Sequence, residues 1–374
     1  LSLSPLRLVL VLIRLILQIY VQLKKWNMVQ SEIINLLHEV GNVFNAVAQQ
    51  TPYSKTQLVI NEDEFLNFEA SIISIERHNP WFTSQNTRSA LGGIAHWLDK
   101  TKLTHWTAQY NLANHQKRIA IIMAGNIPLV GFHDFLCVLL SGHHAVCKFS
   151  SQDAPLWRAV LELMKLIDPR IENTYTISSG KLENFDAVIA TGSNNTAISF
   201  KHYFEKYPNI IRQNRTSVAL LDGTESDEEL QRLADDIFSY FGFGCRNVTQ
   251  LFAPENFDVQ RLFANFLSYQ DWINHHKYMN NYDYYRALYM MNGEEILENG
   301  FVIMRFNELL HAPPAVINCA RYEDLDSVKQ FLENKKEEIQ AVVGHQGIPF
   351  GSAQCPGLID YADGIDVMAF LSEL

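Results

Sequence analysis

The chain has 374 residues, of which 47% are hydrophobic, and a formal net charge of −11. This length and composition are typical of a globular protein with two domains or one elaborated α/β domain, and they exclude a disordered chain. Acidic and basic residues are interspersed, and no basic stripe is present that could neutralise a phosphate backbone. The composition therefore argues against a nucleic-acid partner.

The five cysteines show neither a CxxC pair nor the Cys/His spacing of a zinc site; they stand at positions 137, 147, 245, 319 and 355. An odd number of scattered cysteines is most simply explained by free thiols in a reducing compartment. We therefore expect a cytoplasmic protein without a metal site.

The first 27 residues are rich in Leu, Ile and Val and do not resemble the rest of the chain. Their apolar run, which contains Arg7 and Arg14, reaches about 13 residues, short of the ~20 that a membrane-spanning helix needs. No small-residue cleavage site follows, so a secretory signal fits poorly. Two interpretations stay open: an amphipathic helix on a membrane surface, or, as we prefer, sequence translated from upstream or added for expression, ahead of a folded domain that starts at Met28.

The chain from Met28 to about Tyr110 has apolar residues at spacings of three and four, which predicts helices. Short apolar strands then alternate with helical patterns. Strands are predicted at 117–125, 144–149, 173–177, 186–190, 217–222 and 248–254, and helices at 128–142, 153–167, 196–207, 228–240 and 325–343. This alternation predicts an α/β fold with a mostly parallel, doubly wound sheet.

Ligands of such sheets bind outside the carboxyl ends of the strands, and three predicted strands end in polar residues. Asn126, in "AGNIP", is expected at a helix N-cap with Pro128 just inside the helix; its amide could instead donate to an oxyanion. Lys148 could reach a nucleotide ribose or phosphate, or simply be solvated. Gly192 and Ser193 lead into a helix N-terminus that favours phosphate, or they shape a turn; no GxGxxG fingerprint is present.

Cys245 lies in "YFGFGCRNV", between Gly244 and Arg246 and three residues after Gly242. The glycines permit a tight turn and the close approach of a substrate, and the arginine favours a thiolate. A cysteine in this setting is a nucleophile or a small core residue, and these residues alone do not decide between the two. Cys137 and Cys147, by contrast, lie in apolar segments that are typical of inert packing.

Four motifs together resemble the long-chain acyl-CoA reductases first known from luminous bacteria, a divergent branch of the aldehyde dehydrogenase superfamily. They are "NPWFT" (79–83), "GNIPLVGFHDFLCVLLSGHHAVCKFSSQD" (125–153), "FGFGCRNV" (241–248) and "PGLIDYADGIDVMAFL" (356–371). The resemblance covers the chain from about Met28 to residue 374. It implies an aldehyde-dehydrogenase-like fold with an NADPH-binding domain, a catalytic domain, and reduction of a fatty acyl thioester to an aldehyde.

The resemblance also implies roles for individual residues. Cys245 matches the nucleophile that attacks the acyl carbonyl and expels CoA, and Asn126 matches the asparagine that forms the oxyanion hole with the cysteine backbone. For cofactor binding, the resemblance implies a strand-end lysine with the serines that follow it, a turn beside the pyrophosphate, and a glutamate that holds the nicotinamide ribose. The residues that match are Lys148, Ser150, Ser151, Gly192, Ser193 and, more weakly, Glu308.

Two departures from the superfamily pattern refine this interpretation. Where aldehyde-oxidising members carry a glutamate that activates water, the chain reads "IRQNRTSVALLD", with no carboxylate before Asp222. Slow hydrolysis of an acyl-enzyme favours reduction by a nicotinamide, which needs no activated water. Ser151 stands where NAD-preferring relatives often carry a glutamate, which permits NADPH, although Asp153 is close in sequence.

We therefore expect NADPH-dependent reduction of a long-chain acyl-CoA, with a CoA-acylating aldehyde dehydrogenase for shorter acyl groups and a non-catalytic scaffold as alternatives. The expected organisation is an extension (1–27), N-terminal helices with the NADPH-binding domain (28–213), a catalytic domain (214–345) and a tail (346–374) that could form an interface. By resemblance to the superfamily we also expect a homo-oligomer. Membrane contact could come only through residues 1–27.

Overall fold

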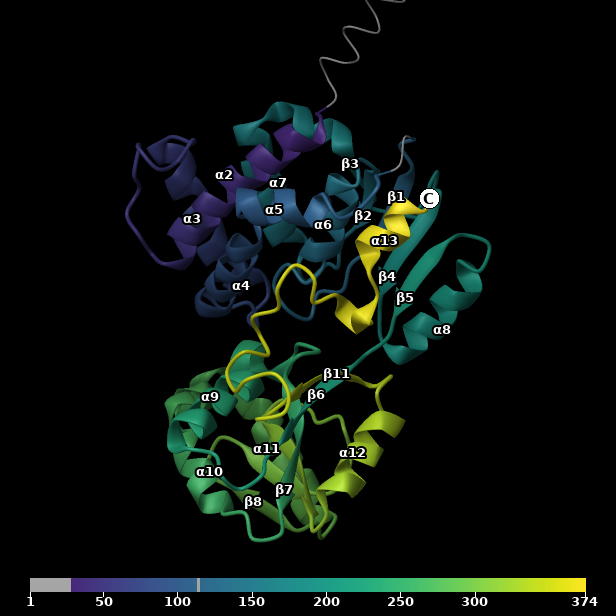
Figure 1. The fold of residues 1–374 in the computed structure, drawn as a ribbon. Coiled ribbons are helices and arrows are strands. Elements are labelled where there is room, and N and C mark those ends of the chain that lie inside the picture. Colours follow the sequence, from purple (N-terminus) through teal and green to yellow (C-terminus); the bar gives the residue numbers. More distant parts are fainter. Residues whose placement is uncertain (1–27, 113–114) are drawn as a thin grey trace, which may run out of the picture.

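The computed structural model describes residues 28–112 and 115–374, which form two lobes (Figure 1). The first lobe comprises residues 28–212 and 358–374 and is built on a five-stranded sheet. The second lobe comprises residues 216–353 and is built on a six-stranded sheet. Residues 1–27 lie outside the described part of the chain, so both interpretations of that segment stay open.

Helices open the first lobe, as the spacing of apolar residues predicts. They are α2 (Gln30–Ala48), α3 (Glu62–His78), α4 (Ser84–Trp97) and α5 (Lys100–Thr107). Asn61, Thr83 and Asp99 cap the last three by accepting a hydrogen bond from a backbone N–H of the first turn. The apolar faces of the helices join the core on one side of the sheet, which confirms the helical N-terminal region.

The sheet of the first lobe is parallel, with the strand order β3-β2-β1-β4-β5. Its strands are β1 (Arg118–Ile122), β2 (His144–Lys148), β3 (Tyr175–Ile177), β4 (Ala187–Thr191) and β5 (Asn209–Arg212). Helices α6 (Phe132–Leu140) and α7 (Ala154–Ile167) pack on one face and α8 (Asn194–Tyr203) on the other. The strand order reverses between β1 and β4, and such a sheet binds ligands in the crevice at this reversal.

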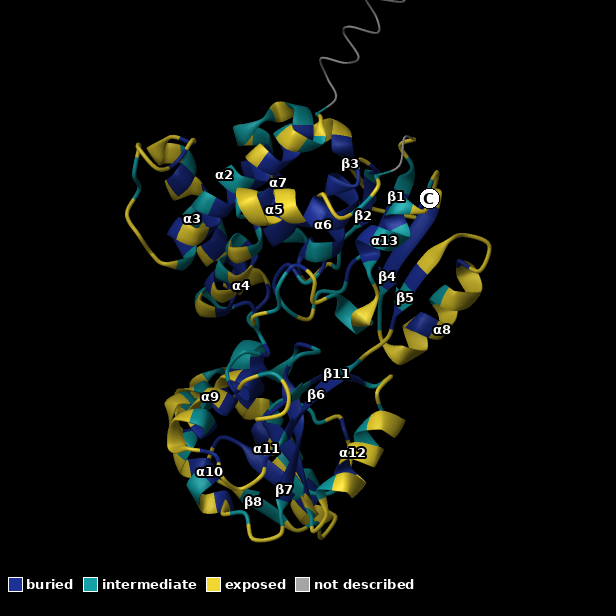
Figure 2. Ribbon diagram, viewed as in Figure 1, coloured by how far each residue is buried: buried dark blue, intermediate teal, exposed yellow. Residues whose placement is uncertain are grey.

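The sheet of the second lobe has the order β11-β6-β7-β10-β9-β8 and is parallel except for β8. Its strands are β6 (Thr216–Leu220), β7 (Val248–Pro254), β8 (Ile296–Glu298), β9 (Ile303–Phe306), β10 (Val316–Tyr322) and β11 (Ile339–Val343). Its helices are α9 (Asp227–Phe238), α10 (Val259–Asn265), α11 (His276–Met291) and α12 (Leu325–Asn334). The central strands of both sheets are buried while α8 and α12 expose their outer sides (Figure 2), so the predicted doubly wound α/β fold is confirmed.

Two predicted helices are wrong in extent. The segment 128–142 becomes helical only at Phe132, because Leu129 adopts a left-handed backbone with φ of 55° and Gly131 takes the N-cap position. The last predicted helix ends at Asn334, and residues 339–343 form strand β11 on the edge of the second sheet. In that segment the burial alternates, with positions 339, 341 and 343 buried, which is a strand pattern.

The tail, residues 346–374, crosses from the second lobe to the first, where it forms α13 (Val367–Ser372) (Figure 1). In the second lobe the buried carboxylate of Asp236 accepts hydrogen bonds from the N–H groups of Gly351 (2.6 Å) and Ala353 (2.9 Å). In the first lobe the hydroxyl of Tyr361 lies 2.7 Å from that of Tyr110. Polar contacts therefore fix the tail to both lobes.

Candidate active site

Cys245 lies in the loop between η2 (Ser239–Gly242) and β7, three residues before that strand begins. The buried Asn247 holds this loop: its Nδ2 donates to the carbonyls of Asp236, Ile237 and Ser239, and its Oδ1 accepts from Gly244 N at 2.7 Å. Tyr240 and Phe241, just upstream, have left-handed φ values of 54° and 57°. One buried amide thus fixes a strained turn that carries the cysteine.

Aromatic side chains of the first and second lobes meet beside this loop. Trp81, from the "NPWFT" motif, packs edge-on against Phe243 with ring centroids 4.7 Å apart and against Phe241 at 5.3 Å. Pro80 O lies 3.0 Å from Nε2 of His275, which belongs to the second lobe. The motif therefore supports the cysteine loop from the opposite lobe.

Asn126 lies in the long turn between β1 and α6, and it reaches the cysteine loop. Its Nδ2 donates to Phe243 O at 2.7 Å, two residues before Cys245. The expectation that Asn126 caps a helix, with Pro128 inside the first turn, is wrong because the helix starts six residues later. The predicted juxtaposition of Asn126 with the cysteine segment is nevertheless present, since the turn extends across the gap between the lobes.

Asp153 holds the turn that carries Asn126. Its carboxylate is fully buried at the start of α7, and its Oδ2 accepts a hydrogen bond from the N–H of Leu129, the residue with left-handed φ (3.0 Å). Gly125 packs so closely on the next strand end that a Cβ there would lie 2.4 Å from the Ser150 hydroxyl oxygen. The turns after β1 and β2 are therefore locked together.

Asp153 gives the protein an unusual pH dependence of stability. Burial raises its pKa to about 7, whereas an unfolded aspartate titrates near 3.9. Between these values the folded state binds more protons than the unfolded state, so this group stabilises the fold at acidic pH and loses that contribution as the pH rises toward 7. The loss amounts to about 1.4 kcal/mol per pH unit.

We expect Asp153→Asn to flatten the slope of unfolding free energy against pH between about 5 and 7, because asparagine keeps an acceptor for Leu129 N without titrating. Urea unfolding at several pH values measures this slope. Asp99→Asn, at an exposed helix cap, is the matched control. Parallel slopes for Asp153→Asn and the unsubstituted protein would contradict the assignment.

The thiol of Cys245 is half-buried, and burial raises its pKa above the usual range. Arg246 lowers this pKa, as its sequence position suggests, but the guanidinium donates to the carbonyls of Ala353 (3.5 Å) and Asp360 (3.3 Å) in the tail. Asp363, also in the tail, raises it. Arg246 thus acts on the thiol in the expected direction, but desolvation outweighs it and the net pKa of Cys245 is raised.

The residues predicted for the cofactor follow three adjacent strands. Ile122 of β1 pairs with Lys148 on one side and with Ala190 of β4 on the other, so the segments after these strands share one edge. Ser193 caps α8 by accepting from Thr196 N, and Ser150 and Ser151 open the turn before α7. Asp153 points inward to Leu129 and is fully buried, so its carboxylate does not face this edge.

Glu308 lies apart from these residues, in the segment between β9 and β10. This segment is tied to β7 through the Thr249 hydroxyl, which donates to Leu310 O at 2.5 Å, and through Gln250 Nε2, which donates to Asn307 O at 3.2 Å. Glu308 itself is exposed and makes no hydrogen bond or ion pair with the described residues. Its segment is thus held beside β7, the strand that follows the cysteine, while its own side chain faces solvent.

Arg212, at the end of β5, lies in the segment where aldehyde-oxidising relatives carry their general base. Its guanidinium is buried and donates to both carboxylate oxygens of Asp134 on α6, at 2.6 and 3.0 Å. Arg212 also lowers the pKa of Cys245, so its charge acts at the thiol. A buried arginine–aspartate ion pair therefore lies on this side of the site.

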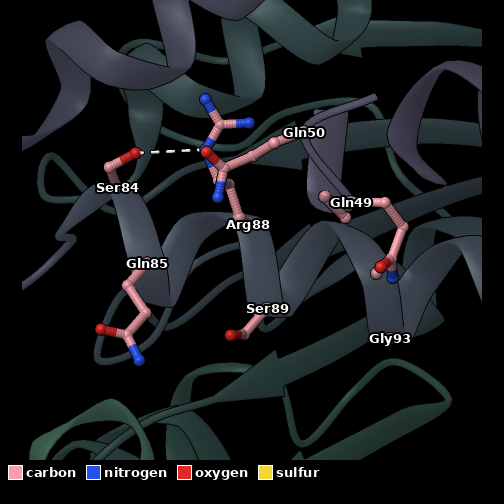
Figure 3. A pocket seen from close by; sticks show the side chains of 9 residues that line it. Gln49, Gln50, Ser84, Gln85, Arg88, Ser89 and Gly93 are labelled. Carbon is pink, nitrogen blue, oxygen red and sulfur yellow. Dashed lines mark hydrogen bonds between the residues drawn. The ribbon is translucent and has the colours of Figure 1, made fainter. Parts of the chain in front are cut away.

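Two other features do not belong to this site. A hollow of about 710 Å³ between the end of α2 and α4 is lined by polar side chains that include Gln50, Gln85 and Arg88 (Figure 3), and it contains none of the predicted site residues. Asp222, Glu225 and His345 have ligand atoms within 4.8 Å of one another. The His345 nitrogens already contact Asp222 (2.8 Å) and Glu229 (3.1 Å), so this group serves to hold a loop.

The contacts between the tail and the cysteine loop were not predicted from the sequence. Ala353, Gln354, Asp360 and Asp363 all contact or influence the cysteine loop, although more than 100 residues separate them from Cys245. The pattern "PFGSAQCPG" shows the glycine and proline spacing of a turn but nothing that indicates which lobe it crosses. The resemblance of residues 356–371 to the family was the one available signal.

In the described part of the chain, no helix is both long enough and apolar enough to cross a membrane. The chain resembles solved aldehyde dehydrogenases at low sequence identity. Aldehyde dehydrogenase 21 from Physcomitrella patens, in complex with the product succinate, has 12% identity and a TM-score of 0.57 over 86% of this chain and 79% of the other. An NAD-dependent aldehyde dehydrogenase from Sinorhizobium meliloti has 11% identity and a TM-score of 0.58 over 84% and 70%.

The Mycobacterium tuberculosis aldehyde dehydrogenase complexed with NAD+ has 13% identity and a TM-score of 0.54, over 82% of this chain and 72% of the other. These likenesses show the aldehyde dehydrogenase fold. No curated protein matches the chain. The sequence model of the family described as Acyl-CoA reductase (LuxC) matches residues 26–268, which is more than half of the chain. The protein is therefore an oxidoreductase that belongs to the LuxC acyl-CoA reductase family.

Proposed function

We propose that the protein reduces a long-chain fatty acyl-CoA to the fatty aldehyde with NADPH, through an acyl thioester on Cys245. The observation that carries this proposal is the hydrogen bond between Asn126 Nδ2 and Phe243 O, because it brings a strand-end amide of the first lobe to the cysteine loop of the second. Membership of the acyl-CoA reductase family supports the acyl substrate. Five free cysteines support a cytoplasmic location.

The first lobe offers the features that a dinucleotide needs. Its strand order, 3-2-1-4-5, creates a crevice where the order reverses, and the N-terminus of α8 follows Gly192 and Ser193 at that crevice. A pyrophosphate fits there because unpaired N–H groups of the first helical turn point outward. Lys148 and Ser151 would meet the adenosine ribose, and the inward orientation of Asp153 leaves no fixed carboxylate from that residue to repel a 2′-phosphate.

The residues of the chain perform the acyl transfer in two steps. The thiolate of Cys245 attacks the thioester carbonyl, the amides of Asn126 and of the Cys245 backbone stabilise the oxyanion, and the bond from carbonyl carbon to CoA sulfur breaks, releasing the CoA thiolate. NADPH, when bound, supplies hydride. The resulting thiohemiacetal oxyanion re-forms a carbonyl as the carbon–sulfur bond to Cys245 breaks, which releases the aldehyde and restores the thiolate.

The direct test is to expose the protein to a long-chain acyl-CoA without cofactor. We expect release of CoA and a mass increase of one acyl group, located at Cys245 by peptide mapping. Addition of NADPH should remove the adduct and yield aldehyde. Chain-length profiling then separates a long-chain site from a short-chain enzyme, since each buried methylene contributes about 0.8 kcal/mol. An adduct on a different cysteine would refute the mechanism.

We expect Asn126→Ala to lower the rate of acyl-enzyme formation by about 10²- to 10³-fold, because it removes an oxyanion donor. The measurement is the rate of CoA release before NADPH is added. Asn45→Ala, on α2, is the matched control. Because Asn126 also bonds Phe243 O, the melting temperature should be recorded. A loss of activity explained by unfolding, or an unchanged acylation rate, would remove Asn126 from the mechanism.

A further inference from the structure

The side chain of Gln354, in the tail, lies against the cysteine loop. A Cβ built on Gly244, the residue before the nucleophile, would be 3.8 Å from Gln354 Oε1 and equally 3.8 Å from the Cδ1 of Ile127. Ile127 follows Asn126 in the turn after β1. Three segments that are distant in sequence therefore converge on the backbone just before Cys245.

The backbone that carries Gln354 is held firmly. Asp236 is fully buried and accepts hydrogen bonds from Gly351 N and Ala353 N, and Ala353 itself is fully buried. Arg246, the residue after the nucleophile, donates to Ala353 O at 3.5 Å. The backbone of residues 353–354 therefore runs beside both chain neighbours of Cys245.

The Nε2 group of Gln354 is buried and has no hydrogen-bond partner among residues 28–112 and 115–374. A buried amide donor without a partner costs about 1–3 kcal/mol, so a fold that keeps one calls for an explanation. Two nearby donors already have acceptors: Gly244 N donates to Asn247 Oδ1, and one N–H of Asn126 donates to Phe243 O. The Gln354 amide, whose Oε1 lies near Gly244, thus carries an uncommitted donor close to the residue before the nucleophile.

We propose that Gln354 is a catalytic residue that donates a hydrogen bond from Nε2 to the oxyanion formed when Cys245 attacks the acyl thioester. This inference rests on the proposed acyl-thioester chemistry. The carbonyl π electrons move onto oxygen as the sulfur–carbon bond forms, and the Gln354 N–H, the Asn126 amide and the Cys245 N–H share the new negative charge. The donor satisfies its hydrogen bond only in this state, which is where stabilisation accelerates a reaction.

Gln354→Met keeps the length of the side chain and removes the donor. We expect acyl-enzyme formation, measured as CoA release without cofactor, to slow by about 10²-fold. Alkylation of Cys245 by iodoacetamide should stay within about twofold, because displacement at a saturated carbon forms no oxyanion. Ser352→Ala, in the same tail segment, should leave both rates unchanged. These measurements use the full chain with Cys355→Ser, so that Cys245 is the accessible thiol.

Gln354→Glu provides the second variant. It places an acceptor of the same shape beside the developing oxyanion. The acylation rate, relative to that of the unsubstituted protein at the same pH, should therefore be lowest at neutral pH and rise toward acidic pH as the carboxyl group protonates. An unchanged acylation rate in Gln354→Met overturns the proposal. A parallel fall of acylation and alkylation also overturns it, because the residue would then only support the loop. Absence of an acyl adduct in the unsubstituted protein would instead refute the proposed function itself.

Discussion

We expect Cys245→Ala to abolish the acyl adduct and to lower aldehyde formation by on the order of 10⁴-fold or more. Removal of a nucleophile in a covalent mechanism eliminates the intermediate, and the residual rate comes only from substrate binding and the oxyanion donors. The measurements are intact mass after exposure to acyl-CoA, and NADPH oxidation with excess substrate. Because alanine leaves Asn247 and its hydrogen bonds in place, the loop should keep its conformation.

The matched control is Cys355→Ser, which alters the exposed cysteine of the tail. It should retain the adduct and the activity. Cys137, Cys147 and Cys319 are buried, and burial raises the pKa of each thiol, so they should label slowly near neutral pH. Turnover by Cys245→Ala at the rate of the unsubstituted protein would disprove the covalent mechanism.

Asp134→Ala is expected to destabilise the protein by about 3–5 kcal/mol, because it leaves the guanidinium of Arg212 buried without its counter-ion. The two side chains are 10% and 5% exposed and joined by two short hydrogen bonds, while Nε of Arg212 has no partner among the described residues. Urea unfolding measures the loss. Substitution of an aspartate on the protein surface would lower the unfolding free energy far less.

The control for that prediction replaces both charges. The double variant Asp134→Leu with Arg212→Met removes the ion pair without leaving a lone charge, and it should recover most of the stability. Comparison of the single and double variants in a cycle isolates the coupling between the two residues. If the unfolding free energy of Asp134→Ala lies within about 1 kcal/mol of that of the unsubstituted protein, the ion pair is accessible to solvent.

The sequence predicted those parts of the fold that depend on local patterns. The strands that begin near Ile119, Ala145 and Ala187 are apolar runs bounded by turns, and buried parallel strands require such runs. The helices of the N-terminal region show regular apolar spacing. For the site, the glycines around Cys245 and the position of Asn126 after a strand made both residues candidates, and only the family resemblance paired them. The structure joins Asn126 to Phe243, two residues before Cys245.

The features that the sequence did not reveal depend on distant partners. Leu129 adopts its left-handed backbone because Asp153 accepts from its N–H, and no local pattern predicts that contact. Residues 339–343 follow a helical stretch without a break, and they become a strand only because β6 offers an unpaired edge. The burial of Cys245 depends on the fold around its loop, so the net direction of its pKa shift could not be predicted either.

The tail adds a mechanical constraint. The chain passes between the lobes twice, once at residues 213–215 and once where the tail leaves Ala353 for the first lobe (Figure 1). If the side-chain contacts of Trp81, Pro80 and Asn126 with the second lobe break, two lobes linked by the chain at two points rotate most easily about the line through both points. Such a rotation would break the hydrogen bond between Asn126 and Phe243 and increase the distance between the two residues. Entry of a ligand into the gap between them and its release would then depend on the same rotation.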